Sequence, residues 1–179
     1  MNFETYVAAV KAGKSIDLYG ALAAFALQYE GTVEDGENRG RLIEAFQRRV
    51  KLEPGSAYCL AFCFFAIDGV GPLMAKVTRL HRTGLVWDVW HRSPPGCRKT
   101  SPRVGYVSCW NIPHSTRGHA GIVTEYGGGD AFKTIEANTS KEPTDPTQDR
   151  EGQGVWQRTR PVQGYSNFTQ LGWLDPWGG

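Results

Sequence analysis

Residues 57–67, Ala-Tyr-Cys-Leu-Ala-Phe-Cys-Phe-Phe-Ala-Ile, are the longest uninterrupted apolar run in the chain, and Asp68 ends it. A run of this length suits either a buried strand or a buried helix. Its Ala, Leu, Phe and Cys side chains, without Val or Thr, favour a helix that is apolar on every side. Such a helix must lie at the centre of a domain. The turn at residues 53–56 places its start near Tyr58 and Cys59.

Helices are expected on the N-terminal side of this segment and strands on its C-terminal side. Apolar spacing predicts helices at 18–30 and 41–50, and short helices at 73–80 and 85–90. Strands are expected at 104–110, 120–126, 131–136, 155–160 and 165–169, with a hairpin signal at 163–164 and a long polar loop at 139–154. Helices followed by strands predict an α+β fold, in which the central helix packs on an antiparallel sheet.

Length and composition bound the class of protein. A chain of 179 residues fits one domain, here residues 1–179. An apolar fraction of 40% with 21% charged residues is typical of a folded chain and not of a disordered one. The net charge of +2 is too small to indicate a nucleic-acid partner. No nucleic acid is therefore expected among the partners, and the chain is expected to be a monomer.

The N-terminal residues and the apolar runs predict in which compartment the protein is made. Residues 1–15 show no charged segment followed by an apolar one, so no Sec signal is recognised. The run at 57–67 is well short of the ~20 residues that a membrane span needs. We therefore expect synthesis in the cytoplasm and no membrane span.

The four cysteines allow several interpretations. Cys59 and Cys63 lie one helical turn apart, whereas Cys97 and Cys109 are isolated from each other. This spacing gives little support for disulfides or for a zinc site. The remaining interpretations are buried free thiols and one catalytic thiol. A thiol at a helix start is favoured as thiolate by the exposed amides and the helix dipole. Cys59 fits that position, and Cys63 is expected to be a packing residue because burial disfavours its thiolate.

A nucleophilic cysteine needs a base and a group that orients the base. His119 opens a predicted strand and is the candidate base. Glu136 and Asn138 lie two positions apart near the end of another predicted strand, so they are expected to share a face. A carboxylate or amide that accepts from an imidazole fixes its tautomer. The other three histidines are interpreted as exposed or structural: His81, His91 and His114.

These segments resemble the papain-like cysteine peptidases and amidases of the CHAP type (cysteine, histidine-dependent amidohydrolase/peptidase), which are related to the NlpC-like cell-wall hydrolases. The likeness spans about residues 20–160. Ala57, Tyr58 and Ala137 stand where the family commonly has Pro, Trp and Gly, and none of these departures removes a reacting atom. Five segments carry the likeness: 37–40 with 46–47, 55–62 (Gly-Ser-Ala-Tyr-Cys-Leu-Ala-Phe), 118–123 (Gly-His-Ala-Gly-Ile-Val), 134–139 (Thr-Ile-Glu-Ala-Asn-Thr) and 150–160.

The resemblance implies a papain-like fold and assigns roles to residues. Cys59 matches the nucleophile, His119 the base, and Glu136 and Asn138 the residues that orient the base. The backbone N–H of Cys59 is one candidate oxyanion donor. The implied activity needs no metal and no cofactor. The implied substrate is an amide bond in the peptide part of bacterial peptidoglycan, cleaved through a thioester.

Several readings of the function stay open. An endopeptidase is favoured, with an N-acetylmuramoyl-L-alanine amidase as the alternative of the same fold. A chain without a Sec signal is expected to reach the cell wall after release or delivery. The expected classes are a phage lysis or tail protein and a delivered toxin. A toxin of this kind would have an immunity or delivery partner. The rival classes are a catalytically inactive structural or binding module, and a cysteine acyltransferase or amidase with a non-wall substrate.

Overall fold

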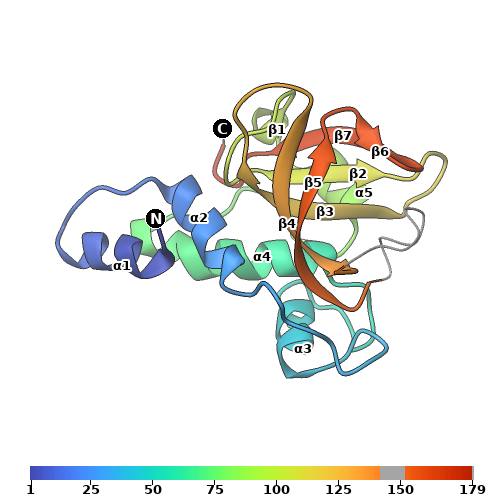
Figure 1. Cartoon of the computed structure of the whole chain (residues 1–179), viewed down its shortest axis with the longest axis horizontal. Coiled ribbons are helices and arrows are strands. Elements are labelled where there is room, and N and C mark those ends of the chain that lie inside the picture. The colour runs from blue at the N-terminus through green and yellow to red at the C-terminus, as the bar shows by residue number, and fades with distance from the viewer. Residues whose placement is uncertain (142–151, 179) are drawn as a thin grey trace.

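The computed structural model describes residues 1–141 and 152–178, and it combines helices with an antiparallel sheet (Figure 1). The predicted α+β class is therefore confirmed. The helices are α1 (Phe3–Lys11), α2 (Leu18–Leu27), α3 (Arg41–Arg48), α4 (Cys59–Val70) and α5 (Val86–Arg92), with short 3-10 turns at Gly71–Met74 and Pro95–Cys97. The strands are β1 (Arg98–Lys99), β2 (Val107–Asn111), β3 (Gly118–Glu125), β4 (Ala131–Thr139), β5 (Gly154–Pro161), β6 (Gly164–Tyr165) and β7 (Phe168–Leu174).

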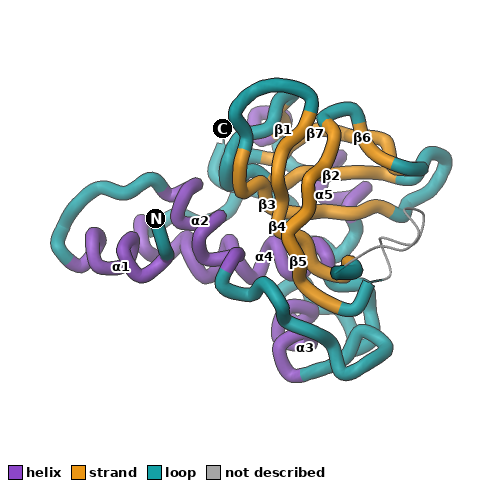
Figure 2. Tube along the Cα trace, viewed as in Figure 1, coloured by secondary structure: helices purple, strands orange, loops and turns teal. Residues whose placement is uncertain are grey.

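Helix α4 is the centre of the structure, as its composition predicts. Nine of its twelve residues are buried, including Cys59 and Cys63. It contacts the helices α2 and α3 and the strands β3 and β4, so it lies between helices and sheet, while α2 also packs on β3 (Figure 2). A helix enclosed on all sides in this way needs no polar face, which explains the continuous apolar run.

The sheet is antiparallel throughout, and its order is β1-β7-β2-β3-β4-β5, with β6 paired to β7. Strand β7, the last in sequence, lies between β1 and β2. Strands β3, β4 and β5 form a meander in which each strand pairs with the next. The sheet twists strongly, so β4 and β5 cross the direction of β2 and β3 in Figure 1.

The two faces of the sheet have separate apolar clusters. The face toward α4 carries Ala120, Ile122 and Ile135, which belong to the main core. The opposite face carries an aromatic cluster, here called the second cluster: Tyr106, Trp110, Val123, Phe132, Phe168 and Trp173. Because neighbouring residues of a strand point to opposite faces, this division fixes which residues of β3 and β4 lie on each face.

Several features differ from the sequence prediction. Helix α1 is not anticipated, although Asn2 caps it by accepting from the backbone N–H of Thr5. The helix predicted at 73–80 is wrong, since the chain forms only a short turn that ends at Met74 and then continues without helix. The second and third strands of the meander run longer than predicted. The predicted strand at 165–169 is wrong, because a turn at 166–167 divides it into β6 and β7, and the hairpin closes there and not at 163–164. Most of the predicted 139–154 loop, and residues 150–151 of the last resembling segment, lie outside the described residues.

Within residues 1–141 and 152–178, no helix combines the length and apolar character required for crossing a membrane.

Candidate functional site

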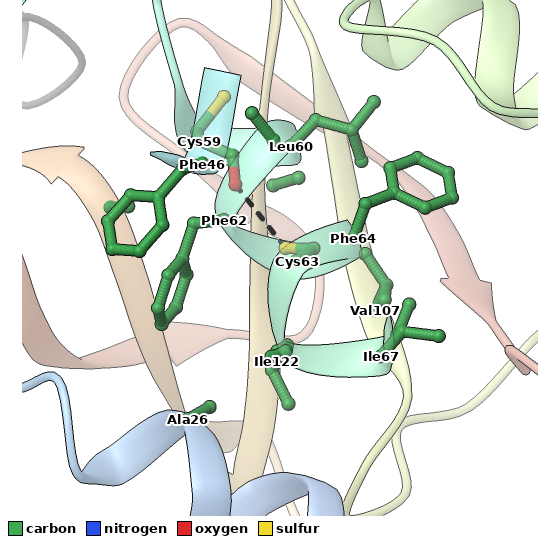
Figure 3. Close-up of a cluster of buried hydrophobic side chains, with 14 of the residues drawn as sticks. Ala26, Phe46, Cys59, Leu60, Phe62, Cys63, Phe64, Ile67, Val107 and Ile122 are labelled. Atoms are coloured by element: carbon green, nitrogen blue, oxygen red, sulfur yellow. Dashed lines mark hydrogen bonds between the residues drawn. The ribbon is translucent and has the colours of Figure 1, made fainter. Parts of the chain in front are cut away.

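Cys59 is the first residue of α4 and is 6% exposed. Tyr58 precedes it as N-cap but makes no side-chain cap, so no side chain competes for the first amides of the helix. In Figure 3 the sulfur of Cys59 lies at the end of the helix, whereas that of Cys63 lies inside the apolar core. The positive end of the helix dipole therefore faces the Cys59 thiol, which favours a negative charge there.

The other cysteines are in environments that oppose ionisation. Burial raises the pKa of Cys63 well above its usual value, and its Sγ lies 3.4 Å from the carbonyl oxygen of Cys59. Burial also raises the pKa of Cys97 and of Cys109. All four cysteines are free thiols, so the disulfide reading is wrong. Among the described residues, no group of three or more His, Cys, Asp or Glu side chains could hold a metal ion.

The segment before α4 is held by Gln47, which is fully buried on α3. Its Nε2 donates to the carbonyl oxygens of Asn38 (2.9 Å) and Ser56 (2.7 Å). Unpaired carbonyl groups in the interior are costly, so Gln47 fixes the path of the chain into Cys59. The sequence signals of Gln47 are its polar side chain beside an apolar helix stripe and the place of residues 46–47 in one of the resembling segments.

His119, the second residue of β3, is completely buried. It lies opposite Trp110 in the β2–β3 register, and the two rings stack at 5.9 Å between centroids. The imidazole belongs to the face of the second cluster, while Ala120 belongs to the face of α4. His119 nevertheless interacts with the Cys59 side chain, and this interaction raises the pKa of the imidazole. This is possible because both residues lie at the ends of their elements. Nδ1 of His119 is buried and has no hydrogen-bond partner among the described residues.

Glu136 is the group that orients His119. It is fully buried on β4, and its Oε2 accepts from Nε2 of His119 at 2.9 Å. Since Nε2 is engaged by the carboxylate, Nδ1 is the ring nitrogen left for the thiol. A neutral ring with its proton on Nε2 has a lone pair on Nδ1, which is the tautomer of a general base.

Arg160 and Thr134 complete the surroundings of Glu136. Arg160 Nε donates to Oε1 at 2.8 Å and Nη2 donates to Oε2 at 2.5 Å, while the Thr134 hydroxyl donates to Oε1 at 2.6 Å. Burial alone would raise the pKa of Glu136, but Arg160 and His119 lower it well below its usual value. The carboxylate is therefore ionised, with both oxygens occupied by donors.

Arg160 is a site residue that the sequence analysis does not single out. It is 5% exposed, and its guanidinium lies 3.8 Å from the centroid of the Tyr165 ring. It pairs opposite Phe132 in the β4–β5 register, so it points to the same face as Glu136. The only sequence signal is its place in the segment that resembles the closing strand of the CHAP type.

Asn138 lies close to Glu136 in sequence but in a different backbone setting. Its φ is +59°, in the left-handed region that asparagine tolerates, and the β4–β5 register shifts between Ala137 and Thr139. The alternation that predicts a shared face for Glu136 and Asn138 is interrupted at this bulge. The backbone N–H of Asn138 donates to the Tyr58 hydroxyl, which itself donates to Glu34 at 3.3 Å. Asn138 thus contacts the residue before Cys59.

Gly121 has no side chain, and this leaves room for the side chain of Glu136 on the neighbouring strand. The two residues are partners in the β3–β4 register, and a Cβ on Gly121 would lie 2.5 Å from Cγ of Glu136 and 3.1 Å from the Ile135 carbonyl oxygen. Any side chain at this position therefore displaces the carboxylate from the imidazole.

We expect Gly121→Ala to lower the catalytic rate by about 10- to 100-fold, since small errors in the position of a catalytic group are costly. Overpacking would also cost about 1–3 kcal/mol of stability. Gly127→Ala is the matched control, because a Cβ there meets no atom within 4 Å. Steady-state kinetics and denaturant unfolding on both variants test this. An unchanged rate in Gly121→Ala would show that the position of Glu136 does not matter.

The protonation of His119 gives a second prediction. Burial lowers its pKa, but the hydrogen bonds and charges of Cys59 and Glu136 outweigh burial and raise it to about 9. The unfolded chain has a histidine pKa of about 6.5. The stabilisation is then complete below pH ~6.5 and is lost as the pH rises through about 9.

We expect the free energy of unfolding of the wild type to fall by up to about 3 kcal/mol between those pH values, relative to His119→Gln. Denaturant unfolding of both proteins across pH 6–10 measures the difference. Parallel pH curves for the two proteins would contradict a raised pKa.

The chain matches no protein-family model, no curated protein and no solved structure. The functional assignment therefore depends on the geometry of the site and on the motifs of the sequence.

Proposed function

We propose that the chain is a cysteine hydrolase of papain-like type, related to the CHAP peptidases and amidases. The observation that supports this most directly is the position of His119, whose ring donates from Nε2 to the buried carboxylate of Glu136 and interacts with the Cys59 side chain. A nucleophile, a base and a group that orients the base are the parts that acyl transfer requires.

In the proposed mechanism, His119 takes the thiol proton at Nδ1. A His119 pKa of about 9 keeps the ring protonated near pH 7, in agreement with a thiolate–imidazolium pair. The Cys59 sulfur attacks the amide carbonyl carbon, and the carbonyl oxygen becomes an oxyanion. When this intermediate collapses, the C–N bond breaks, the imidazolium gives its proton to the leaving amine, and a thioester remains on Cys59.

Hydrolysis of the thioester returns the enzyme to its starting state. His119 removes a proton from water, and the hydroxide adds to the thioester carbonyl. The C–S bond then breaks, which releases the acid and restores the Cys59–His119 pair. Backbone N–H groups in the first turn of α4, including that of Cys59, are suited to stabilise the oxyanion in both steps.

The substrate class depends on the resemblance of the five segments to CHAP-type enzymes. We propose an amide bond in the peptide part of bacterial peptidoglycan, cleaved as an endopeptidase, with the chain acting on the wall after release or delivery. No part of the mechanism requires a metal or cofactor.

Digestion of purified peptidoglycan, followed by mass spectrometry of the products, tests the substrate. New amino and carboxyl termini that form with wild type and not with Cys59→Ala would support the proposal. Their position separates endopeptidase from N-acetylmuramoyl-L-alanine amidase cleavage. Intact sacculi of both Gram types after incubation with folded wild type would contradict a wall substrate.

The reactivity of the thiol tests the catalytic machinery without a substrate. We expect iodoacetamide to alkylate Cys59 at pH 6 at least ~10-fold faster than a cysteine in an unfolded peptide, because the thiolate fraction is larger. The His119→Gln variant should lose this advantage. A wild-type rate equal to that of the peptide would favour an inactive module.

A further inference from the structure

A cavity of about 190 Å³ lies directly beside Cys59. Three segments enclose it: the turn before α4, the start of α5, and the β2–β3 connection just before His119. Its volume is below the roughly 300–1,000 Å³ of pockets that hold whole small-molecule ligands. A space of this size next to the nucleophile suits one residue of an extended peptide.

The walls of the cavity are mainly apolar. Leu52, Ala57, Leu85 and Val86 line it. Leu85 is 52% exposed, so its apolar side chain is available to a residue that enters the cavity. Gly84 packs closely on Leu52, since a Cβ there would lie 2.8 Å from both methyl groups of that leucine, and the cavity itself has only about 190 Å³. The residue that enters must therefore be small and uncharged.

One charged side chain, Arg117, lines the same cavity. It is exposed, and within residues 1–141 and 152–178 it forms no ion pair. The guanidinium group presents donors in a planar fork that matches a carboxylate. An arginine with no acidic partner in the described part of the chain, next to an apolar cavity and the Cys59 thiol, has the chemistry of a group that pairs with an anionic substrate.

We propose that this cavity is the substrate subsite for a small apolar residue that is next to a carboxylate, and that Arg117 binds that carboxylate. The carboxylate is either the free C-terminus of the small residue or the side chain of an adjoining acidic residue. The inference rests on the proposed function, because it assigns a substrate to the same thiol. It makes Arg117 a residue that determines specificity and not one that takes part in bond cleavage.

Two alkylating agents test the charge preference without any turnover. Iodoacetate carries a carboxylate where iodoacetamide carries an amide, and both react with the Cys59 thiolate. We expect the iodoacetate/iodoacetamide rate ratio of the wild type to exceed that of Arg117→Gln at least about fivefold, because a nearby cation raises the local concentration of the anion. Arg48→Gln is the control, since it removes the same charge from an exposed position on α3.

Peptides then identify the source of the carboxylate. We would measure how well four peptides protect Cys59 from iodoacetamide: one ending in alanine as the free acid, its C-terminal amide, one with an internal Ala-Glu, and its Ala-Gln counterpart. The proposal expects one acid to protect at a concentration ~10-fold lower than its neutral counterpart, in the wild type and Arg48→Gln but not in Arg117→Gln. The acid that protects identifies the source.

Two results would overturn the inference: equal protection by acids and their neutral counterparts, or a preference that persists in Arg117→Gln. Both differ from failure of the proposed function, in which Cys59 reacts no faster than a peptide cysteine with either reagent.

Discussion

Cys59→Ala is expected to lower the rate of amide hydrolysis by roughly 10⁴- to 10⁶-fold, since loss of the nucleophile leaves only binding and oxyanion stabilisation. Cys59 and Cys63 belong to the same helix one turn apart, and both are buried. They differ in position relative to His119, which interacts with Cys59, and in the burial that raises the pKa of Cys63 well above its usual value. Measured kcat with a peptide or peptidoglycan substrate gives the effect.

Cys63→Ala is the matched control for this change. It removes one sulfur from the core, so we expect a loss of about 1–2 kcal/mol in stability and near wild-type activity. The opposite pattern, with activity lost in Cys63→Ala and kept in Cys59→Ala, would contradict the assignment of the nucleophile.

Arg160→Met is expected to reduce the free energy of unfolding by about 3–5 kcal/mol, because it leaves the buried carboxylate of Glu136 without its cation. The methionine side chain fills much of the volume but donates no hydrogen bond, so both contacts to Glu136 are lost. Burial then raises the pKa of Glu136, and a smaller fraction of it is ionised. Urea unfolding at pH 7 measures the loss of stability.

The pH profile separates a positioning role of Arg160 from a purely structural one. With Arg160 present, the lowered pKa of Glu136 keeps the carboxylate charged down to acidic pH. We therefore expect the acidic limb of the activity profile to move to higher pH in Arg160→Met. Lys133→Met is the control, since it breaks an exposed ion pair with Glu125 on the neighbouring strands and should cost at most about 1 kcal/mol. An unchanged acidic limb would assign Arg160 to stability alone.

The sequence predicts the central helix and the meander because their signals are local. An apolar run with a turn before it defines α4, and alternating residues with glycine turns define the strands. The short-helix prediction at 73–80 fails because apolar spacing over so few residues carries little information. Helix α1 is marked chiefly by Asn2, a capping residue too common to be decisive alone.

Some residues of the candidate site can likewise be predicted from local sequence signals, and others cannot. The sequence predicts Cys59 and His119 as candidates because Cys59 follows a turn at the start of the apolar run and His119 opens a predicted strand. The roles of Arg160 and Gly121 depend on cross-strand register, which a single sequence does not contain. The backbone setting of Asn138 is not predicted, because a bulge changes the face to which a residue points and no nearby residue in the sequence indicates this bulge.

The order of the strands has a consequence for synthesis of the protein. Translation delivers Cys59 long before its base, and the strand that fills the place between β1 and β2 is β7, which ends at Leu174. A nascent chain that lacks β7 exposes one edge of β2, and one that lacks β5 has no Arg160 to neutralise Glu136. Chains emerge from the ribosome N-terminus first. Glu136 therefore gains its cation only after β5 has left the ribosome, and β2 is paired on both edges only after β7 has followed.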